Sequence, residues 1–302
     1  MTRILVVGSL VMDLAFDVPA VPGPGEVILA TAFGRYRGGK GYNQAVAAAR
    51  MGAEVVMVGA VGDDDFGRAF LTALDAEGVD ASRVVVLDGV ATAVAVPLVT
   101  PDGDVGFVQY QGANRQLDAA VAADLPDCDA LLLQGEIQAP VSLAAARAVR
   151  SRGGRVVLNP APVHDISDEL ATTATVITPN EVEAAALLGR DAADLDGEAA
   201  ARALVTDQRA AVVTLGARGA AWADGSRSGA VAPPGVEAID ATAAGDSFNA
   251  ALAIALAEGQ GYADALRFAT AAGAHATTIR GAEPALPTRA DVEALLDAAG
   301  SD

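Results

Sequence analysis

Cysteine, lysine and histidine are all scarce in this sequence of 302 residues, which holds one cysteine, one lysine and two histidines. The single Cys128 excludes an intrachain disulfide and favours a reducing compartment. Because three leucines follow shortly after it, we expect a buried structural thiol rather than a nucleophile. His164 and His275 lie far apart in the chain, so the sequence predicts neither a Cys/His metal cluster nor a Ser-His-Asp triad.

Long apolar runs and an excess of positive charge are also absent. The first apolar run, residues 4–12, is too short to span a bilayer and lacks a small-residue cleavage site, so we interpret it as a buried strand. The 39 acidic and 20 basic residues give a net charge of −19, which would repel a nucleic-acid backbone. Hydrophobic residues make up 52% of the chain, enough for a large core. We therefore expect a soluble, cytoplasmic, globular protein with no nucleic-acid or membrane partner.

Short β-branched runs alternate with Ala-rich stretches along most of the chain. The predicted strands are residues 4–8, 55–59, 130–134, 155–159, 175–178 and 211–215. The predicted helices are residues 41–51, 66–77, 141–151, 181–188, 199–206, 246–258 and 262–278. Glycines at 52, 78, 153, 189 and 259 are expected to end helices. This alternation predicts an α/β fold with a mostly parallel sheet flanked by helices.

Two segments interrupt the alternation. Residues 14–36 carry several prolines and glycines between strand-like pieces, and residues 92–111 form a predicted hairpin with Pro101-Asp102-Gly103-Asp104 as its turn. We expect the two segments to form one small β lid, although two separate surface hairpins would fit the same pattern. The predicted division is a body of residues 1–13, 37–91 and 112–302 and a lid of residues 14–36 and 92–111.

The only lysine, Lys40, lies in the glycine-rich turn Gly38-Gly39-Lys40-Gly41 at the start of a predicted helix. Glycines allow close approach of a ligand to the backbone, and a helix start offers free N–H groups. An ammonium at this point suits a ligand hydroxyl or phosphate. The turn is not a P-loop, because Gly41 stands where that loop needs Ser or Thr, and no dinucleotide-binding glycine pattern follows the first strand.

A second motif, Ala243-Ala244-Gly245-Asp246, precedes a long predicted helix. Such a turn exposes N–H groups at the positive end of the helix dipole and can hold an anion. A carboxylate beside it makes chemical sense if it takes a proton from a hydroxyl that attacks a phosphoryl group. The alternative is an ordinary N-terminal aspartate that caps the helix.

Two weaker patterns complete the set. Asn180 and Glu183 lie three residues apart at a strand end, where they suit either Mg²⁺ or a helix capping box. Residues 214–219 form a glycine-rich turn after a strand, a common ligand position in α/β proteins. Trp222 is expected in the core.

Together these motifs resemble the PfkB carbohydrate-kinase family, most closely its ribokinases. The resemblance runs almost end to end through residues 8–13 (GSLVMD), 24–26 (PGE), 38–50 (GGKGYNQAVAAAR), 61–64 (VGDD), 112–114 (GAN), 158–162 (LNPAP), 177–181 (ITPNE), 214–219 (TLGARG) and 243–249 (AAGDSFN). It implies a ribokinase-like three-layer α/β/α body with a mostly parallel central sheet and a small β-sheet lid, often paired with a second lid in a homodimer. It also implies an ATP-dependent kinase that phosphorylates a primary hydroxyl of a pentose-like sugar.

The resemblance assigns roles to individual residues. Asp246 is the implied base, and the backbone N–H groups of Ala243, Ala244 and Gly245 are the implied anion hole. The implied sugar contacts are Asp13, Gly39, Lys40, Asn43 and Glu136. The implied nucleotide contacts are Asn180, Thr214, Gly216, Arg218, Gly219 and Thr270. Asn180 and Glu183 are implied to order Mg²⁺ and its waters, and a monovalent cation such as K⁺ is implied at Asp240, Thr242, Ala276, Ile279 and Gly281.

Four positions depart from the family pattern. Val11 replaces an asparagine and cannot hydrogen-bond a sugar hydroxyl, which disfavours ribose. Tyr42 replaces a small residue, and its ring is predicted to narrow the sugar pocket or stack on a ligand. Ala285 stands where a serine often binds the monovalent cation, and Ala241 replaces a threonine.

These departures leave the acceptor open between ribose, a deoxy sugar, fructose, 2-keto-3-deoxygluconate and a nucleoside. A non-catalytic ligand sensor on the same scaffold is the alternative of a different class.

Overall fold

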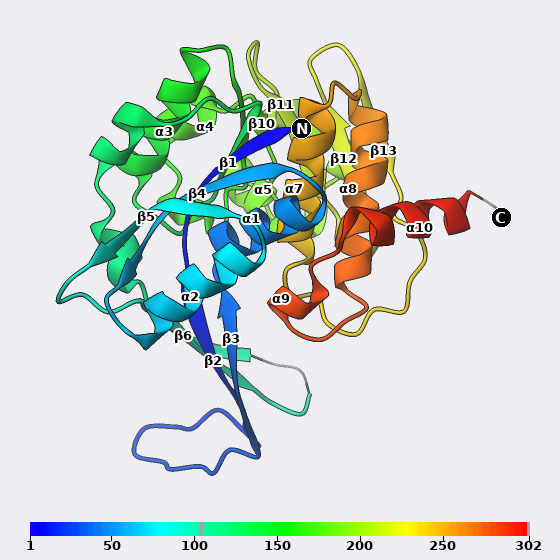
Figure 1. Ribbon diagram of the computed structural model, residues 1–302. Coiled ribbons are helices and arrows are strands. Elements are labelled where there is room, and N and C mark those ends of the chain that lie inside the picture. The colour runs from blue at the N-terminus through cyan, green and yellow to red at the C-terminus, as the bar shows by residue number, and fades with distance from the viewer. Residues whose placement is uncertain (103–104, 301–302) are drawn as a thin grey trace.

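The computed structural model describes residues 1–102 and 105–300, which form a body around a large sheet and a second, smaller sheet (Figure 1). The large sheet has nine strands in the order β13-β12-β11-β10-β9-β8-β1-β4-β5. Its strands are β1 (Arg3–Val7), β4 (Glu54–Gly62), β5 (Asp80–Leu87), β8 (Ala130–Leu133), β9 (Arg155–Leu158), β10 (Val176–Ile177), β11 (Ala210–Thr214), β12 (Ala220–Ala223) and β13 (Ser228–Val231). All neighbours pair in parallel except β11–β12 and β12–β13, which confirms the predicted, mostly parallel sheet.

Helices cover both faces of this sheet. The α-helices are α1 (Lys40–Arg50), α2 (Asp65–Ala76), α3 (Ala139–Arg150), α4 (Asp168–Thr173), α5 (Glu181–Leu188), α6 (Gly197–Leu204), α7 (Ala244–Ala257), α8 (Tyr262–Ala276), α9 (Ala282–Ala285) and α10 (Arg289–Ala299). Short 3₁₀ turns are η1 (Gly112–Gln116), η2 (Ala119–Asp124), η3 (Val163–Asp165), η4 (Ala192–Asp194) and η5 (Gly216–Arg218). Among the described residues, none of the helices has the length and apolar character needed to cross a membrane.

The central strand β1 shows how the three layers form. Ile4 and Val6 pack into one apolar core with α1, α2, α7, α8 and α10. Leu5 and Val7 point the other way, into a core with α3, α4, α5 and α6. Because successive side chains of a strand point to opposite faces, a continuous apolar run supplies both cores at once. The structure therefore confirms the α/β/α layers.

The strands that the sequence pattern missed lie at the two ends of the sheet. Several side chains of edge strand β5 are exposed, so its sequence is not a continuous apolar run. β12 consists of alanines around Trp222, and alanine has no preference for strands. Trp222 is in the core as expected, where it stacks on Tyr262 with ring centroids 5.3 Å apart.

The small sheet has the order β3-β2-β6-β7, with β2 (Val11–Asp17), β3 (Ala32–Gly38), β6 (Ala93–Val99) and β7 (Val105–Tyr110). It projects from one end of the body (Figure 1). The two interrupting segments thus share one sheet, as expected, instead of forming separate hairpins. β2 begins at Val11, so the small sheet includes Val11–Asp13, which the sequence analysis placed in the body. Gly103 and Asp104 of the predicted turn lie outside the described residues.

Two smaller expectations concern helix ends and the thiol. All five glycines predicted to end helices have the left-handed backbone that suits this position. Cys128 is half-buried, and burial raises the pKa of its thiol to about 11. A thiol with so high a pKa is a poor nucleophile at neutral pH, which agrees with a structural role.

Candidate active site

The glycine-rich turn joins the small sheet to the start of α1. Gly39 has φ 90°, and a Cβ at Gly41 would lie 2.5 Å from the backbone nitrogen of Ser9, so both positions need glycine. The Glu136 carboxylate accepts hydrogen bonds from the backbone N–H of Lys40 at 2.8 Å and from the Ser9 hydroxyl at 2.5 Å. Glu136 therefore fixes the first turn of α1 against the loop that follows β1.

The Lys40 ammonium makes no hydrogen bond or ion pair within the described part of the chain. Burial alone would lower the pKa of Lys40, but the negative charges of Asp246, Glu136 and Glu183 outweigh burial and raise it. The structure thus brings three predicted site carboxylates around the only lysine. A charged ammonium without a direct partner is available to a ligand.

Asp246 is in the first turn of α7 and is only 6% exposed. Its Oδ2 accepts from Asn43 Nδ2 at 2.9 Å, and its Oδ1 accepts from Gln44 Nε2 at 3.0 Å. Burial raises the pKa of Asp246, while the charge of Lys40 and these two donors oppose the rise. The arrangement holds a carboxylate in a fixed plane without neutralising it through an ion pair.

The N-terminus of α7 is the predicted anion hole. Ala243 caps the helix with φ 61°, the only positive φ of a non-glycine residue among those described. The N–H groups of Ala243 and Gly245 bond to no other described residue, and a Cβ on Gly245 would meet no atom within 4 Å. The N–H of Ala244 differs from the prediction, because it donates to the carbonyl of Ala241 at 3.2 Å. Two of the three predicted donors are therefore open.

A buried pair anchors this helix end to the sheet. Asn249 Nδ2 donates to the carbonyl of Gly245 at 2.8 Å, and its Oδ1 accepts from the Thr178 hydroxyl at 2.5 Å. Thr178 follows β10 at the carboxyl edge of the sheet. The amide tip of α7 is thereby held over that edge, where open α/β sheets bind ligands.

The predicted nucleotide loop lies at the same edge. The backbone N–H of Thr214 donates to the carbonyl of Pro179 at 3.0 Å, which places residues 214–219 beside Asn180. Gly219 has φ 88° and closes the turn, and the Arg218 side chain pairs with Glu181. The structure therefore brings together Asn180, Thr214, Gly216, Arg218 and Gly219.

Thr270 lies in α8, apart from the nucleotide loop in the sequence. It is 4% exposed, and its hydroxyl donates to the carbonyls of Leu266 and Arg267 in its own helix. The proton of the hydroxyl is used in this way, so a nucleotide contact through this group stays a prediction in which the oxygen would accept a hydrogen bond.

Asn180 and Glu183 form the capping box that was the alternative to a magnesium site. Asn180 Oδ1 accepts from the N–H of Glu183, and Glu183 Oε2 accepts from the N–H of Asn180, both at 2.8 Å. Burial raises the pKa of Glu183, while the Asn180 N–H and the charge of Lys40 oppose the rise. The second oxygen of Glu183 makes no hydrogen bond to a described residue and remains available.

Asp240 connects the loop before α7 to the loop after α8. Its carboxylate accepts from the N–H and hydroxyl of Thr242 at 2.9 and 2.6 Å and from the N–H of Gly281 at 2.8 Å. Burial would raise the pKa of Asp240, but these donors hold it below its usual value. The other predicted cation positions, Ala276 and Ile279, lie in or directly before the same loop.

Val11 and Asp13 are on β2, at the root of the small sheet. Val11 is buried against Ala93 and Ala95 of the neighbouring strand. Burial, together with the negative charge of Glu136, raises the pKa of Asp13 to about 7. Asp13 and Glu136 therefore share one partly desolvated region, as predicted for sugar contacts.

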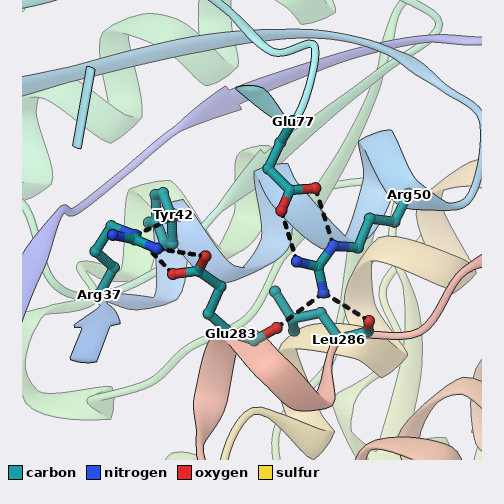
Figure 2. Close-up of polar contacts among 6 residues, drawn as sticks. All are labelled: Arg37, Tyr42, Arg50, Glu77, Glu283 and Leu286. Carbon is teal, nitrogen blue, oxygen red and sulfur yellow. Dashed lines mark hydrogen bonds and ion pairs between the residues drawn. The ribbon is translucent and has the colours of Figure 1, made fainter. Parts of the chain in front are cut away.

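Tyr42 is not a pocket residue, and that prediction is wrong. Its side chain is 0% exposed, its ring packs edge-on against Phe70, and its hydroxyl accepts from Arg37 Nε at 3.3 Å. Figure 2 shows Arg37 donating to both Tyr42 and Glu283. Residues 42 and 43 are about 100° apart around a helix, so Tyr42 faces away when Asn43 faces Asp246.

Several polar residues at the site were not identified from the sequence. They are Ser9, Gln44, Gln134, Thr178 and Asn249, and all are less than 2% exposed. All five were inside quoted motifs or predicted strands but had no distinct local pattern. A buried polar residue next to a predicted catalytic carboxylate would be the signal to look for.

Comparisons with known proteins agree with this geometry. Residues 1–289 match the model of the pfkB family of carbohydrate kinases. The chain is 38% identical over 300 residues to a ribokinase of Bacillus subtilis (98% of this chain, 100% of the relative) and 31% identical over 292 residues to a deoxyribokinase of Salmonella typhimurium (94% and 95%). The solved structure of an Arabidopsis thaliana ribokinase complexed with ribose and ATP superimposes with a TM-score of 0.87 at 30% identity, covering 98% of this chain and 99% of that one. The chain belongs to the pfkB family of carbohydrate kinases.

Proposed function

We propose that this enzyme transfers the γ-phosphoryl group of ATP to a primary hydroxyl of a pentose-like sugar, with ribose as the first candidate. The observation that carries the proposal is the junction of α1 and α7. A buried carboxylate, an open helix N-terminus and an unpaired ammonium meet there. These are the base, the anion site and the counter-charge that phosphoryl transfer requires.

In this mechanism Asp246 takes the proton from the attacking sugar hydroxyl. The open N–H groups of Ala243 and Gly245, at the positive end of α7, bind the oxygens of the transferring group. Lys40 stabilises the negative charge that develops on those oxygens. Proton transfer and charge stabilisation thus come from two helices fixed against each other by Asn43 and Gln44.

The sugar is bound at the root of the small sheet. Asn43 Oδ1 is buried without a partner, which suits a ligand hydroxyl as donor. Asp13 and Glu136 are carboxylates that accept hydrogen bonds from further hydroxyls, and Gly39 allows close approach of the ring. The raised pKa of Asp13 fits a group whose hydrogen-bond partner arrives with the substrate.

ATP binds along the carboxyl edge of the sheet. Asn180, Thr214, Gly216, Arg218 and Gly219 meet there and lead to the tip of α7. The Arabidopsis relative that was solved in complex with ribose and ATP has the same fold, which supports ATP as the phosphoryl donor.

Magnesium fits Asn180 and Glu183 through water. The described residues contain no group of three or more His, Cys, Asp or Glu side chains that could hold a metal directly. One free carboxylate oxygen beside a phosphate site is typical of Mg²⁺, which keeps several waters and binds mainly to phosphates. When bound, the ion neutralises phosphate charge.

A monovalent cation such as K⁺ fits the loops that Asp240 connects. The low pKa of Asp240 keeps a negative charge between residues 240–242 and 276–281, where backbone carbonyls of Thr242, Ala276, Ile279 and Gly281 are the proposed ligands. Ala285 is buried and supplies no side-chain oxygen, so we expect weak cation binding.

The small sheet serves as a lid and as the contact of a homodimer. Its edge strands β3 and β7 expose aromatic side chains, namely Phe33, Tyr36, Phe107 and Tyr110. Exposed aromatic side chains are enriched at protein interfaces. Light scattering that gives the mass of one chain at micromolar concentration would exclude the dimer. The use of ATP and the single half-buried thiol favour a cytoplasmic enzyme.

The test is ADP release by the purified protein with ribose, 2-deoxyribose, fructose, 2-keto-3-deoxygluconate and a nucleoside as acceptors. We expect the highest kcat/KM with a pentose. If none of these acceptors releases ADP while calorimetry still detects ligand binding, the chain is a sensor and not a kinase.

A second candidate acceptor is 2-deoxyribose. Val11 is buried with Ala93 and Ala95 in an apolar cluster, so position 11 supplies no hydrogen-bond partner for a sugar hydroxyl. The relative named a deoxyribokinase shows that the family includes such a specificity. Val11→Asn should raise the ratio of ribose to deoxyribose kcat/KM by roughly 10-fold, whereas Val11→Leu should leave it unchanged.

A further inference from the structure

A chain of buried side-chain amides ends on the proposed base. Gln134 follows strand β8 in the centre of the large sheet, and its Nε2 donates to Gln44 Oε1 at 2.7 Å. Gln44, on α1, donates through Nε2 to Asp246 Oδ1 at 3.0 Å. Gln134 is 1% exposed and Gln44 is 0% exposed, so neither amide can touch a substrate.

The orientation of each amide depends on the next one. The NH₂ group of Gln134 occupies the oxygen of Gln44, and the NH₂ group of Gln44 therefore points at Asp246. With both amides reversed, the oxygen of Gln44 would face the carboxylate, which is acceptable only when Asp246 is protonated. The observed direction of the chain thus favours the charged form of Asp246.

The surroundings of Gln134, the amide farthest from Asp246, permit this orientation of the two amides. Gln134 Oε1 is buried without a hydrogen-bond partner and lies against the backbone of Gly8, where any Cβ would overlap it. An unpaired buried carbonyl is costly, so it needs a compensating gain elsewhere. Presenting two aligned NH₂ groups toward the base supplies that gain.

Asn43 differs from Gln44 in the partner of its side-chain oxygen. Both donate to Asp246, one to each carboxylate oxygen. The oxygen of Asn43 has no partner within the described residues and remains free for a ligand, whereas the oxygen of Gln44 is held by Gln134. Asn43 therefore contacts substrate, and Gln44 acts only through Asp246.

We propose that Gln44 and Gln134 are positioning residues that orient the Asp246 carboxylate and keep it charged for proton transfer. The proposal rests on the proposed role of Asp246 as the base. The charged groups that act on Asp246 are Lys40 on α1 and Glu136 after β8. Glu183 on α5 acts on Lys40 in turn.

The experiment measures kcat against pH at saturating sugar and ATP, for wild type and for Gln44→Met. At saturating substrate, kcat reports on the enzyme–substrate complex, so the ionisation of Asp13 in the ligand-free enzyme does not affect its pH profile. Loss of the donor should lower kcat by roughly 10- to 100-fold and move its acid limb upward by about half a pH unit or more. The KM for ATP should change by less than about threefold, because the nucleotide loop is untouched.

Gln134→Met and the double variant separate positioning from packing. Gln134→Met should shift the profile in the same direction by a smaller amount. The double variant should be no slower than Gln44→Met, since Gln134 reaches Asp246 only through Gln44. Ser142→Ala is the control, because Ser142 is buried on α3 without a partner and away from the chain of amides; its kcat should equal that of wild type.

Three results would overturn the proposal. A wild-type profile in Gln44→Met, with turnover retained, removes the positioning role while leaving the proposed kinase intact. A lower kcat with an unmoved acid limb and additive losses in the double variant assigns both residues to packing alone. Absence of ADP release from wild type with every acceptor ends the proposed function and this inference together.

Discussion

Helix α1 carries two polar networks of opposite character. Toward α7, neutral amides of Asn43 and Gln44 surround the Asp246 carboxylate. Toward α9, Arg37 pairs with Glu283 through two hydrogen bonds of 2.7 and 2.8 Å. The first network fixes a carboxylate without an ion pair, and the second ties together elements that are distant in sequence.

The second network extends along the helix, as Figure 2 shows. Arg50 makes a two-bond ion pair with Glu77 and donates to the carbonyls of Glu283 and Leu286. Arg37 belongs to strand β3 of the small sheet, so this cluster joins the root of the lid to α1 and α9. An arginine facing Asp246 would instead lower its pKa and make it a poorer base. The difference teaches that the direct contacts of the Asp246 carboxylate are neutral donors, whereas ion pairs hold the opposite side of the helix.

Among the variants that test this comparison of the two networks, Lys40→Met should lose the most activity. Lys40 is the cation whose charge acts on Asp246, and its ammonium has no protein partner among the described residues. Its loss should lower kcat/KM for sugar by about 10³-fold, because charge on the transferring group is no longer stabilised. The Tm should not fall. Lys40→Arg is the control: a guanidinium keeps the charge but not the point-like geometry, and should recover only part of the activity. Retention of more than about a tenth of the activity in Lys40→Met would contradict this role.

Asp13→Asn should have the next largest effect. It should lower activity while it raises the stability of the ligand-free protein. The pKa of Asp13, raised to about 7, means that the folded, ligand-free protein binds a proton between about pH 4 and 7 that the unfolded chain does not. Stability therefore falls as pH rises from about 4 to 7, and above about pH 7 the full cost of ionising Asp13 is present.

The variant should raise the Tm of the ligand-free protein by roughly 2 °C at pH 8 and by less at pH 5, and should lower kcat/KM for sugar by about 10²-fold. In wild type, kcat/KM for sugar should decline as pH falls below about 7. Thermal unfolding at the two pH values and steady-state kinetics check these points; a lower Tm at pH 8 would show that Asp13 stabilises the ligand-free fold.

Glu283→Gln should have the smallest effect on catalysis. It removes the ion pair with Arg37, which is partly exposed, so solvent screening limits the loss of stability to about 1 kcal/mol. We expect a Tm lower by roughly 2–4 °C and a kcat within about twofold of wild type. A kcat reduced about tenfold at unchanged Tm would erase the distinction between the two networks.

The sequence predicted the layers correctly, and it yielded candidate site residues, because the signals of both are local. An apolar run such as β1 and a glycine-rich turn around the only lysine are visible without knowledge of the fold. Asp246 was predicted as the base in the same way, from small residues before a helix.

The rest depends on contacts between distant segments. Gln134 and Gln44 are 90 positions apart, and a glutamine that ends on a carboxylate has no local pattern. Tyr42 was predicted to narrow the pocket because it replaces a small residue of the glycine-rich turn, whereas the helix directs its ring against Phe70. The sequence also does not show that the Thr270 hydroxyl bonds back to its own helix, because such a bond leaves no local pattern.

The most direct test of the central claim is kcat of Asp246→Asn at saturating sugar and ATP, with ATP affinity measured by calorimetry on the same protein. Asparagine keeps the shape of the side chain but cannot take the proton. The account predicts a kcat about 10³-fold lower, or less, with an ATP Kd within about threefold of wild type. Turnover above about a tenth of the wild-type value would show that another group accepts the proton.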